Sequence, residues 1–340
     1  MIRRPIGKIT IEELRDVITP LLGGEDKDVL IGPGVGEDAS VVKYGDRMLV
    51  LKSDPISGAL DLIGWLSVHV NANDIATKGG VPKWFLASLI LPTSFNAKSV
   101  RTIMQQIHRG ALELGVSVVG GHTEFTGGVT HPIVAGAMIG VIDGTRYFST
   151  KNARPGELLV QTKAAGIEAT SIIATDLAEE VGSRLGENFV SKCKEYIKKI
   201  SIVQEARIAY GNSGVSSLHD CTEGGVITAA YEIAEACGGG LLIWEDKIPV
   251  WEETRKLTEM YDLDPIKILS SGSLLITVDR LHLNILLADL KKSGVNASVI
   301  GEIKDAEHGR KIRDRNGVVT DIVIPEADPL WNLFDRIVKA

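Results

Sequence analysis

The segment Val118–Gly128, V-V-G-G-H-T-E-F-T-G-G, decides how we interpret the rest of this sequence. An apolar run ends there in two adjacent glycines, and polar and acidic side chains follow. The pattern predicts a buried strand that presents Val116, Val118 and Val119. Gly120 and Gly121 would then let the backbone turn and approach a ligand that a Cβ atom would exclude.

Three polar residues, His122, Thr123 and Glu124, follow these glycines. They would stand at the end of the predicted strand, where ligands of α/β sheets usually collect. A glycine-rich hairpin turn is the alternative interpretation. Two other segments favour a site, because they repeat the design of an acid, small residues and an adjoining apolar run: G-E-D-A-S-V-V from Gly36 and H-D-C-T-E-G-G from His219.

Five carboxylates share this setting, each flanked by small or apolar residues at the end of a predicted element: Asp38, Asp54, Asp74, Glu124 and Asp220. If they converge in space, they repel one another unless cations lie among them. An oxygen-rich site of this kind suits Mg²⁺, which commonly bridges carboxylates to the phosphates of a nucleotide.

Asp74 lies on a predicted helix, Ile63–Lys78, that is nearly free of charge between Asp61 and Lys78. Asn71, Asp74 and Lys78 share one face of it at spacings of three and four. A solvated polar stripe is the alternative interpretation. An unpaired carboxylate in this apolar neighbourhood would be costly, which favours a functional one.

Other kinds of site find less support in the sequence. His122, Glu124 and His131 could offer three zinc ligands, but their spacing matches no zinc pattern. The sequence has no phosphate loop ending in Gly-Lys-Ser/Thr, no dinucleotide fingerprint and no nucleophile elbow. Cys221 adjoins Asp220, although a small packing residue is the simpler interpretation of this thiol.

The chain of 340 residues is long enough for two domains. Near K-N-A-R-P-G, residues 151–156, the sequence restarts with a turn and a new strand, so we expect domains 1–152 and 153–340. Strands and helices alternate in both halves, which predicts an α/β fold with an α+β rhythm. At the two ends, a helix capped by Thr10 and Glu13 and an amphipathic helix around Leu330–Ile337 are both expected to pack.

Composition limits the partners and the compartment. The net charge of −7 argues against a nucleic-acid partner. No run of about 18 apolar residues and no signal-peptide pattern occur, so we expect neither export nor a membrane span. The three cysteines form no C-x-x-C pair, which fits the reducing cytoplasm better than a disulfide framework.

Six motifs in order make the sequence resemble a known family: G-E-D-A-S-V-V, S-D-P-I-S-G, H-V-N-A-N-D-I-A-T-K-G-G-V-P, V-G-G-H-T-E, T-K-A-A-G-I-E and L-H-D-C-T-E-G-G. They are similar to the aminoimidazole ribonucleotide synthetase superfamily, and most similar to its hydrogenase maturation factors of the HypE type. The resemblance implies a two-domain α/β protein. It also implies a homodimer in which the strands of the N-terminal domains join into a barrel, with ATP and Mg²⁺ bound in a cleft at the domain and subunit interface.

The resemblance also implies roles for individual residues. Those that match the family's magnesium and phosphate-site acids are Asp38, Asp54, Asp74 and Asp220. The nucleotide-side positions are Asn71, Gly120, Gly121, Thr123, Glu124 and Thr222, and Lys163 matches a lysine near the phosphates. The implied catalytic residues are Asp74, Lys163 and Asp220. The implied chemistry is attack of an amide or carbonyl oxygen on the γ-phosphate of ATP, to which the protein contributes positioning and charge neutralisation.

Three features depart from the HypE pattern. Glu223 stands where an arginine is usual, Ser271 stands where a glutamate is common, and the chain ends F-D-R-I-V-K-A without the terminal cysteine that carries the carbamoyl group. We therefore expect a HypE-like paralogue that acts on a separate small-molecule or protein-borne amide, with a maturation-complex protein as a further partner.

Two alternatives stay open at this point. A kinase of the thiamine monophosphate kinase type has a similar set of acids, and a non-catalytic ATP-binding scaffold would keep the same nucleotide site. A selenophosphate synthetase is less consistent with the sequence, because that enzyme needs a reactive cysteine or selenocysteine near its N-terminus and the first cysteine here is Cys193.

Overall fold

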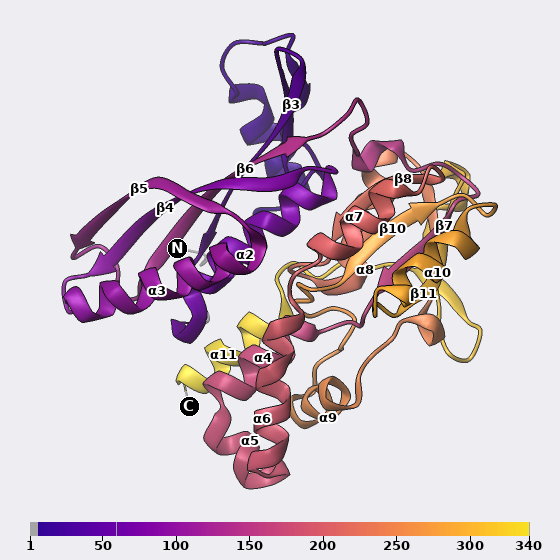
Figure 1. Cartoon of the computed structure of the whole chain (residues 1–340). Coiled ribbons are helices and arrows are strands. Elements are labelled where there is room, and N and C mark those ends of the chain that lie inside the picture. The colour runs from indigo at the N-terminus through magenta and orange to yellow at the C-terminus, as the bar shows by residue number, and fades with distance from the viewer. Residues whose placement is uncertain (1–5, 59, 340) are drawn as a thin grey trace. The chain divides into compact units, whose positions relative to one another are not determined.

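The computed structural model describes residues 6–58 and 60–339, which form two compact units (Figure 1). The first unit consists of Asp26–Gly32 and Asp38–Tyr147, and the second of the described parts of Met1–Glu25, Pro33–Glu37 and Phe148–Ala340. Each unit is built on one sheet, so the chain has a mixed α/β fold with two sheets. The predicted functional division after residue 152 stays a prediction.

The sheet of the first unit has six strands in the order β1-β2-β3-β6-β4-β5. Neighbouring strands are antiparallel except β4 and β5, which run parallel. The strands are β1 Val29–Ile31, β2 Ser40–Tyr44, β3 Arg47–Ile56, β4 Val81–Pro92, β5 Ser117–Thr126 and β6 Ile133–Ile142. The sequence predicts strands over Ala39–Val42, Arg47–Asp54, Trp84–Leu91 and Ile133–Ile142, close to the bounds of β2, β3, β4 and β6.

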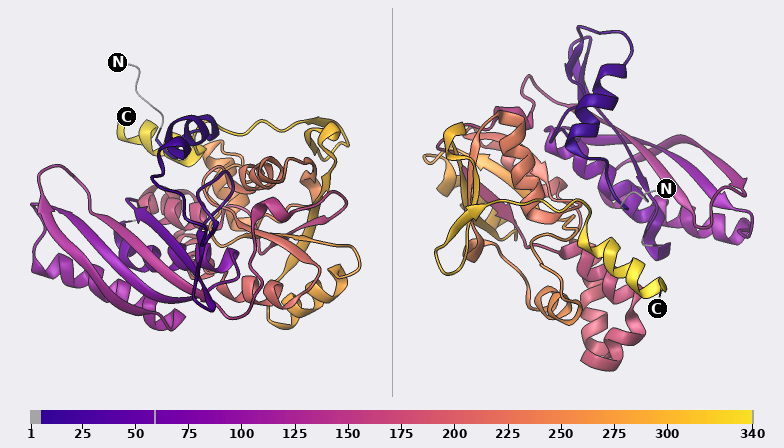
Figure 2. Two further views of the ribbon diagram at one scale, coloured as in Figure 1. Left: turned by 90° about the horizontal axis from the view of Figure 1, so that it is seen from above. Right: turned by 180° about the vertical axis from the view of Figure 1, so that it is seen from behind.

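Two helices, α2 Ile63–Thr77 and α3 Ala97–Leu114, cover one face of this sheet (Figure 2). Every residue of α2 is buried, because the helix lies against both the sheet and α3. The two helices approach closely at Gly64, where an added Cβ would lie 2.4 Å from the carbonyl oxygen of Ile103. The sequence predicts an amphipathic helix over Asn96–Leu114 that stops at Gly115. Helix α3 confirms it, with Asn96 as N-cap and Gly115 in the left-handed conformation after its last residue.

The other face of the same sheet keeps apolar side chains exposed. Along β4, Phe85 and Leu89 are buried, whereas Trp84 and Leu86 are 41% and 36% exposed. This alternation arises because successive side chains of a strand point to opposite faces. Leu51 on β3 is also exposed. The first unit by itself therefore leaves an apolar sheet face uncovered.

The segment that guided the sequence analysis forms β5, but the prediction of a buried strand that turns at its glycines is wrong. β5 is an edge strand, and Val118 and Val119 are 40% and 56% exposed. The strand continues through both glycines to Thr126. Gly121, at φ 149°, lies so close to β4 that an added Cβ would be 2.0 Å from the carbonyl oxygen of Ala87. The close approach at this glycine is to a neighbouring strand.

The second unit contains a seven-stranded sheet in the order β13-β12-β9-β11-β7-β10-β8. Its strands are β7 Leu158–Thr162, β8 Val215–Asp220, β9 Gly240–Trp244, β10 Leu274–Val278, β11 Ala297–Lys304, β12 Arg310–Arg313 and β13 Val319–Asp321. The parallel pair is β9 and β12, and the other pairs are antiparallel. Helix α8, Gly225–Cys237, packs on this sheet through Val226, Ala230 and Ile233.

The remaining α-helices of this unit are α1 Ile11–Glu13, α4 Ile167–Asp176, α5 Ala178–Leu185, α6 Glu187–Lys194, α7 Val203–Gly211, α9 Glu252–Tyr261, α10 Leu283–Lys292 and α11 Pro329–Lys339. The sequence predicts one helix over Thr170–Glu180 where the structure has α4 and α5, and a final pair of strands where the sheet has β11, β12 and β13. It predicts none of α7, α9 and β9. These segments are short, and tertiary contacts decide their boundaries.

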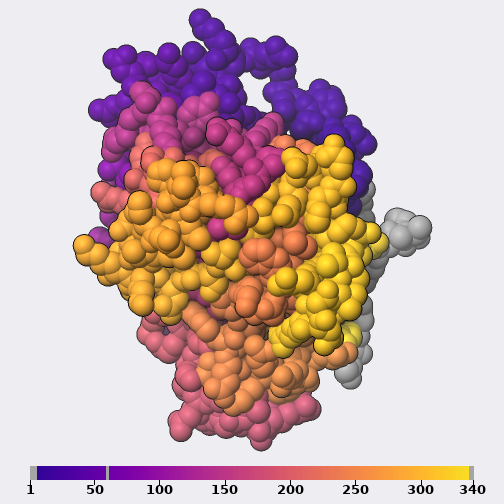
Figure 3. All heavy atoms as spheres, turned by 90° about the vertical axis from the view of Figure 1, so that its right-hand side faces the viewer, coloured from indigo at the N-terminus to yellow at the C-terminus, as the bar shows by residue number. Residues whose placement is uncertain are grey.

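Both ends of the described chain carry helical segments. The capping box of Thr10 and Glu13 is confirmed, but the expectation that the first helix packs is wrong, since Ile18 and Leu21 are 44% and 81% exposed. The docking of α11 is confirmed by the burial of Leu330 and Leu333, and its yellow segment lies on the surface of the second unit (Figure 3). The side chain of Ile337 and the last residue, Ala340, lie outside the described residues.

Two further expectations can be compared with the described residues. None of the described helices has the length and apolar character that crossing a membrane requires. Cys193, Cys221 and Cys237 are free thiols.

The close packing at Gly121 predicts that Gly121→Ala lowers the free energy of unfolding by about 1–3 kcal/mol or more, through backbone strain and contact with Ala87. Gly120→Ala is the matched control, because its added Cβ would meet only Leu86 Cδ2 at 3.6 Å. Urea denaturation of the two variants measures the difference. Equal stability of both would contradict the packing role.

Candidate functional site

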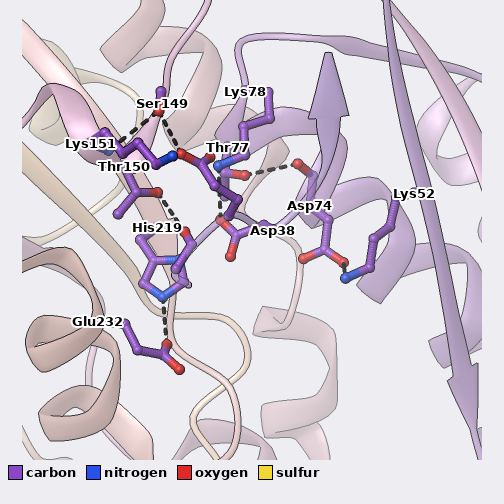
Figure 4. Close-up of polar contacts among 12 residues, drawn as sticks. Asp38, Lys52, Asp74, Thr77, Lys78, Ser149, Thr150, Lys151, His219 and Glu232 are labelled. Atoms are coloured by element: carbon purple, nitrogen blue, oxygen red, sulfur yellow. Dashed lines mark hydrogen bonds and ion pairs between the residues drawn. The ribbon is translucent and has the colours of Figure 1, made fainter. Parts of the chain in front are cut away.

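Lys52 joins two of the predicted metal-site acids within the first unit. Asp54 lies near the end of β3, and Asp74 lies in the last turn of α2. Lys52 and Asp54 share a face of β3, because side chains two residues apart on a strand point the same way. The Lys52 Nζ atom is 2.9 Å from Asp74 Oδ2 (Figure 4). The same Nζ atom is 3.6 Å from Asp54 Oδ2. We call Lys52, Asp54 and Asp74, together with Asp38, the acid cluster.

Burial and neighbouring charges act on the ionisation of this cluster. Burial raises the pKa of Asp74 to about 7; Lys52 opposes the rise, and Asp38 and Asp54 add to it. Burial also disfavours the charged form of Lys52, but Asp74 and Asp54 outweigh it and hold the pKa of Lys52 above its usual range. Lys52 therefore remains an ammonium that partly neutralises the acids around it.

A second lysine accompanies the remaining acid of the cluster. The Nζ atom of Lys78 is 3.9 Å from Asp38 Oδ2, and the side chain of Lys78 is fully buried. Lys78 directly follows the last residue of α2, where the carbonyl groups of a helix end favour a cation. The alternative interpretation of Asn71, Asp74 and Lys78 as a solvated polar stripe is excluded, because all three residues are buried.

Asn71 connects α2 to β3 beside the cluster. Its Nδ2 atom donates to the carbonyl oxygens of Asp54, at 3.1 Å, and Ser67, at 2.8 Å. Its Oδ1 atom is buried and receives no hydrogen bond from any described residue. A buried amide oxygen without a donor is unusual and costly. Asn71 thus combines a structural bond with an acceptor that a ligand could use.

The other predicted nucleotide residues of this unit, Gly120, Gly121, Thr123 and Glu124, lie along the exposed edge strand β5. Glu124 does not join the acid cluster through any ion pair recorded in residues 6–58 and 60–339. Its Oε2 atom instead lies 3.3 Å from His122 Nε2. The convergence expected for five acids therefore applies, within the first unit, to Asp38, Asp54 and Asp74.

Asp220 ends β8 in the second unit and is buried. The preceding His219 lies 2.8 Å, Nε2 to Oε2, from Glu232 of α8 (Figure 4). After Asp220 the chain turns through Gly224 and Gly225, whose φ angles of 75° and 67° only glycine adopts easily. This turn delivers the chain from β8 into α8.

The sequence predicts a helix over Val226–Cys237 whose N-terminal amides could bind an anion. In the structure, the N-terminus of this helix, α8, is contacted by a carboxylate of the protein itself. Asp328 Oδ2 accepts a 2.8 Å hydrogen bond from the amide of Gly224, and Asp328 Oδ1 accepts one from the amide of Leu330 in α11. Burial raises the pKa of Asp328 to about 6, while these two amides oppose the rise. One side chain thus caps two helices.

Two residues of the same turn are also held from both ends of the chain. Lys8 donates from Nζ to Thr222 Oγ1 and from its amide to Glu223 Oε2, each at 3.0 Å. Trp331 Nε1 donates to Glu223 Oε1 at 3.2 Å. Glu223 therefore anchors the N-terminal segment and α11 to this turn.

Lys163 has its ammonium group surrounded by protein acceptors. Nζ donates to the carbonyl oxygens of Lys199, at 2.8 Å, and Ser201, at 2.7 Å, and lies 2.6 Å from Glu205 Oε1. Burial lowers the pKa of Lys163, while Glu205 opposes the change. Because an ammonium has three N–H donors, this arrangement uses all of them within the protein.

Sequence reasoning missed Lys52, Lys8 and Asp328. Lys52 had a local signal, since K-S-D on a predicted strand places it on the same face as Asp54. Lys8 and Asp328 had none, because they meet the Thr222–Gly224 turn from positions more than 100 residues away in the chain.

Comparison with known protein families assigns the chain to one of them. Residues 36–142 match the family described as AIR synthase related protein, N-terminal domain, and residues 154–313 match its C-terminal domain. Together these matches span more than half of the sequence. The protein belongs to the AIR synthase-related family, as its motifs predicted.

Individual relatives narrow the comparison. Carbamoyl dehydratase HypE of Escherichia coli is 27% identical over 86% of this chain and 86% of its own length, and that of Rhodobacter capsulatus is 27% identical over 95% of both. Thiamine-monophosphate kinase of Pyrococcus horikoshii is 30% identical over 80% of this chain and 84% of its own length.

Solved structures support the same fold. A crystal structure of E. coli HypE superposes with a TM-score of 0.74 and 24% identity, covering 95% of this chain and 98% of the other. HypE in a HypE–HypF complex gives a TM-score of 0.73 and 23% identity over 86% and 94%. The fold is therefore that of HypE, without a closed barrel in the described part of the single chain.

The network around Lys163 predicts that Lys163→Met lowers the free energy of unfolding by about 3–5 kcal/mol, because Glu205 would remain buried without its cation. The double variant Lys163→Met/Glu205→Gln should recover much of this loss. Thermal and urea denaturation measure both. A fully stable Lys163→Met variant that has lost ATP turnover would instead support the predicted catalytic role.

Proposed function

We propose that this protein is a HypE-like, ATP-dependent enzyme that activates an amide or carbonyl oxygen by phosphoryl transfer. The observation that carries the proposal is similarity to carbamoyl dehydratase HypE of Rhodobacter capsulatus along 95% of the chain. Little covalent chemistry falls to the protein in such a reaction, so buried carboxylates and lysines that position charge are the expected machinery.

The acid cluster fits a magnesium ion. Asp38, Asp54 and Asp74 offer hard carboxylate oxygens, the donor type that Mg²⁺ prefers. These three would hold the ion, with Asp220 as a fourth proposed ligand. When bound, Mg²⁺ supplies neutralisation of the charge on phosphate oxygens. When no ion is bound, Lys52 and Lys78 reduce the repulsion among the carboxylates and so stabilise the cluster.

The proposed nucleotide residues are Asn71, Gly120, Gly121, Thr123, Glu124 and Thr222. The free acceptor of Asn71 and the exposure of β5 support this assignment. Thr222 bonds Lys8 through its hydroxyl, so a nucleotide contact there would be shared with that lysine. The proposed catalytic residues are Asp74, Asp220 and Lys163. The variants Lys163→Met and Lys163→Met/Glu205→Gln test the role of Lys163 separately.

A separate substrate is the finer part of the proposal. Glu223 bonds Lys8 and Trp331, so this position serves structure where the HypE pattern has an arginine. Ser271 is buried and offers a hydroxyl in place of a carboxylate that could act as acid or base. We therefore propose a small-molecule or protein-borne amide substrate and, as for the HypE of the HypE–HypF complex, a maturation-complex partner.

The kinase relative from P. horikoshii favours a second candidate, phosphorylation of a small alcohol or phosphate group. Incubating the protein with Mg-ATP and candidate small amides, or with thiamine monophosphate, and measuring ADP release separates the two activities. A scaffold without turnover would bind ATP and release no ADP with either.

We predict that Asp74→Ala abolishes Mg-ATP binding, because loss of this carboxylate removes a ligand and leaves the cation under-coordinated. Isothermal titration calorimetry measures the affinity. Asp46→Ala, in the exposed turn after β2, is the control and should bind as the unmodified protein does. Wild-type affinity of Asp74→Ala would overturn the proposed metal site.

We also propose a homodimer whose N-terminal sheets close into a barrel across the two-fold axis. The uncovered face that includes Leu51, Trp84 and Leu86 supports it, because pairing would bury this apolar surface. Light scattering should give a dimer at micromolar concentration and a monomer for Trp84→Asp. The control Leu281→Asp changes a residue that is 88% exposed and should remain dimeric. A monomeric wild-type protein would contradict the proposal.

A further inference from the structure

The acid cluster already contains a cation of the protein's own. We propose that Lys52 is an internal counter-ion for Asp54 and Asp74 when no divalent cation is bound, and that it competes with Mg²⁺ for their oxygens. The inference rests on the proposed magnesium site and adds to it a residue that controls its affinity.

Two lysines compensate the negative charges of the three acids in the cluster. Lys78 is the ion-pair partner of Asp38, and it is fully buried. Lys52 is the ion-pair partner of Asp54 and Asp74. Without Lys52, Asp54 and Asp74 would lose their ion-pair partner while they and Asp38 still repel one another, which is unfavourable near a buried helix end.

Geometry makes the lysine and the metal alternatives. The ammonium lies 2.9 Å from Asp74 Oδ2, so a magnesium ion held by this oxygen would have the lysine head group beside it. Two cations at one carboxylate oxygen repel each other. Binding of the metal therefore requires Lys52 to withdraw.

The surroundings allow this withdrawal. The side chains of Lys52 and Asp54 are 22% and 35% exposed, whereas that of Asp74 is 4% exposed. The flexible four-carbon stem of a lysine can move its head group toward the open side at Asp54. Lys78, which is 0% exposed, has no such route. Of the two lysines, Lys52 is thus the one that can exchange with an ion.

Lys52→Met tests the competition, with its side chain similar in length but uncharged. Without divalent cations we expect a lower melting temperature than that of the wild type. With MgCl₂ alone as the titrant, we expect about tenfold tighter binding in calorimetry, equivalent to about 1.4 kcal/mol, and a larger Mg²⁺-induced rise in melting temperature. Lys43→Met, on the exposed end of β2 without an ion pair among the described residues, is the control and should match the wild type.

The outcomes separate this inference from the proposed function. If the wild type binds Mg²⁺ and Lys52→Met binds it equally or more weakly, the competition is wrong and the metal site stands. If neither binds Mg²⁺, the proposed metal site fails, and the inference fails with it. If Lys52→Met folds only when Mg²⁺ is present, the ion has replaced the lysine, which supports the inference. Lys52→Gln keeps a polar head group and supplies the same comparison should the methionine variant aggregate.

Discussion

The burial of charge beside α2 is the constraint on which the first unit depends. Asp74 lies on a helix whose every residue is buried, so its carboxylate can persist only with a cation nearby. Lys52 supplies that charge from β3, and Lys78 supplies another to Asp38 from the end of the helix. The same contacts that allow the fold to bury these groups hold three carboxylates in one place, which is why structure and proposed chemistry coincide there.

The second unit solves a comparable problem with hydrogen bonds from distant parts of the chain. The turn between β8 and α8 contains the amide of Gly224 and the carboxylate of Glu223. Residues near the two ends of the sequence form hydrogen bonds with both groups. Asp328, which precedes the first residue of α11, caps both α8 and α11. Lys8 and Trp331 donate hydrogen bonds to Glu223. The position of α11 is therefore coupled to the turn that presents Asp220. A displacement of α11 would therefore also displace this turn.

The family to which the chain belongs contains relatives named for different reactions. The acids at the ends of β3 and α2 are consistent with the proposed phosphoryl chemistry, and the relatives bear the names of a carbamoyl dehydratase and of a thiamine-monophosphate kinase. Fold similarity alone does not choose between a dehydratase and a kinase, since function resides in particular side chains. Measuring ATP turnover with defined phosphoryl acceptors would distinguish a dehydratase from a kinase.

The sequence by itself determined the family, most strands of the first sheet, the caps of α3 and the acids at element ends, because ordered motifs, periodicity and caps are local features. It could not determine that β5 is an exposed edge strand, since an apolar run is compatible with the centre or the edge of a sheet. Only the tertiary structure decided that Lys52 enters the acid cluster, that Lys163 is held by Glu205 and that Asp328 caps α8. These contacts join residues from separate elements, and which elements meet is decided by packing of the whole unit.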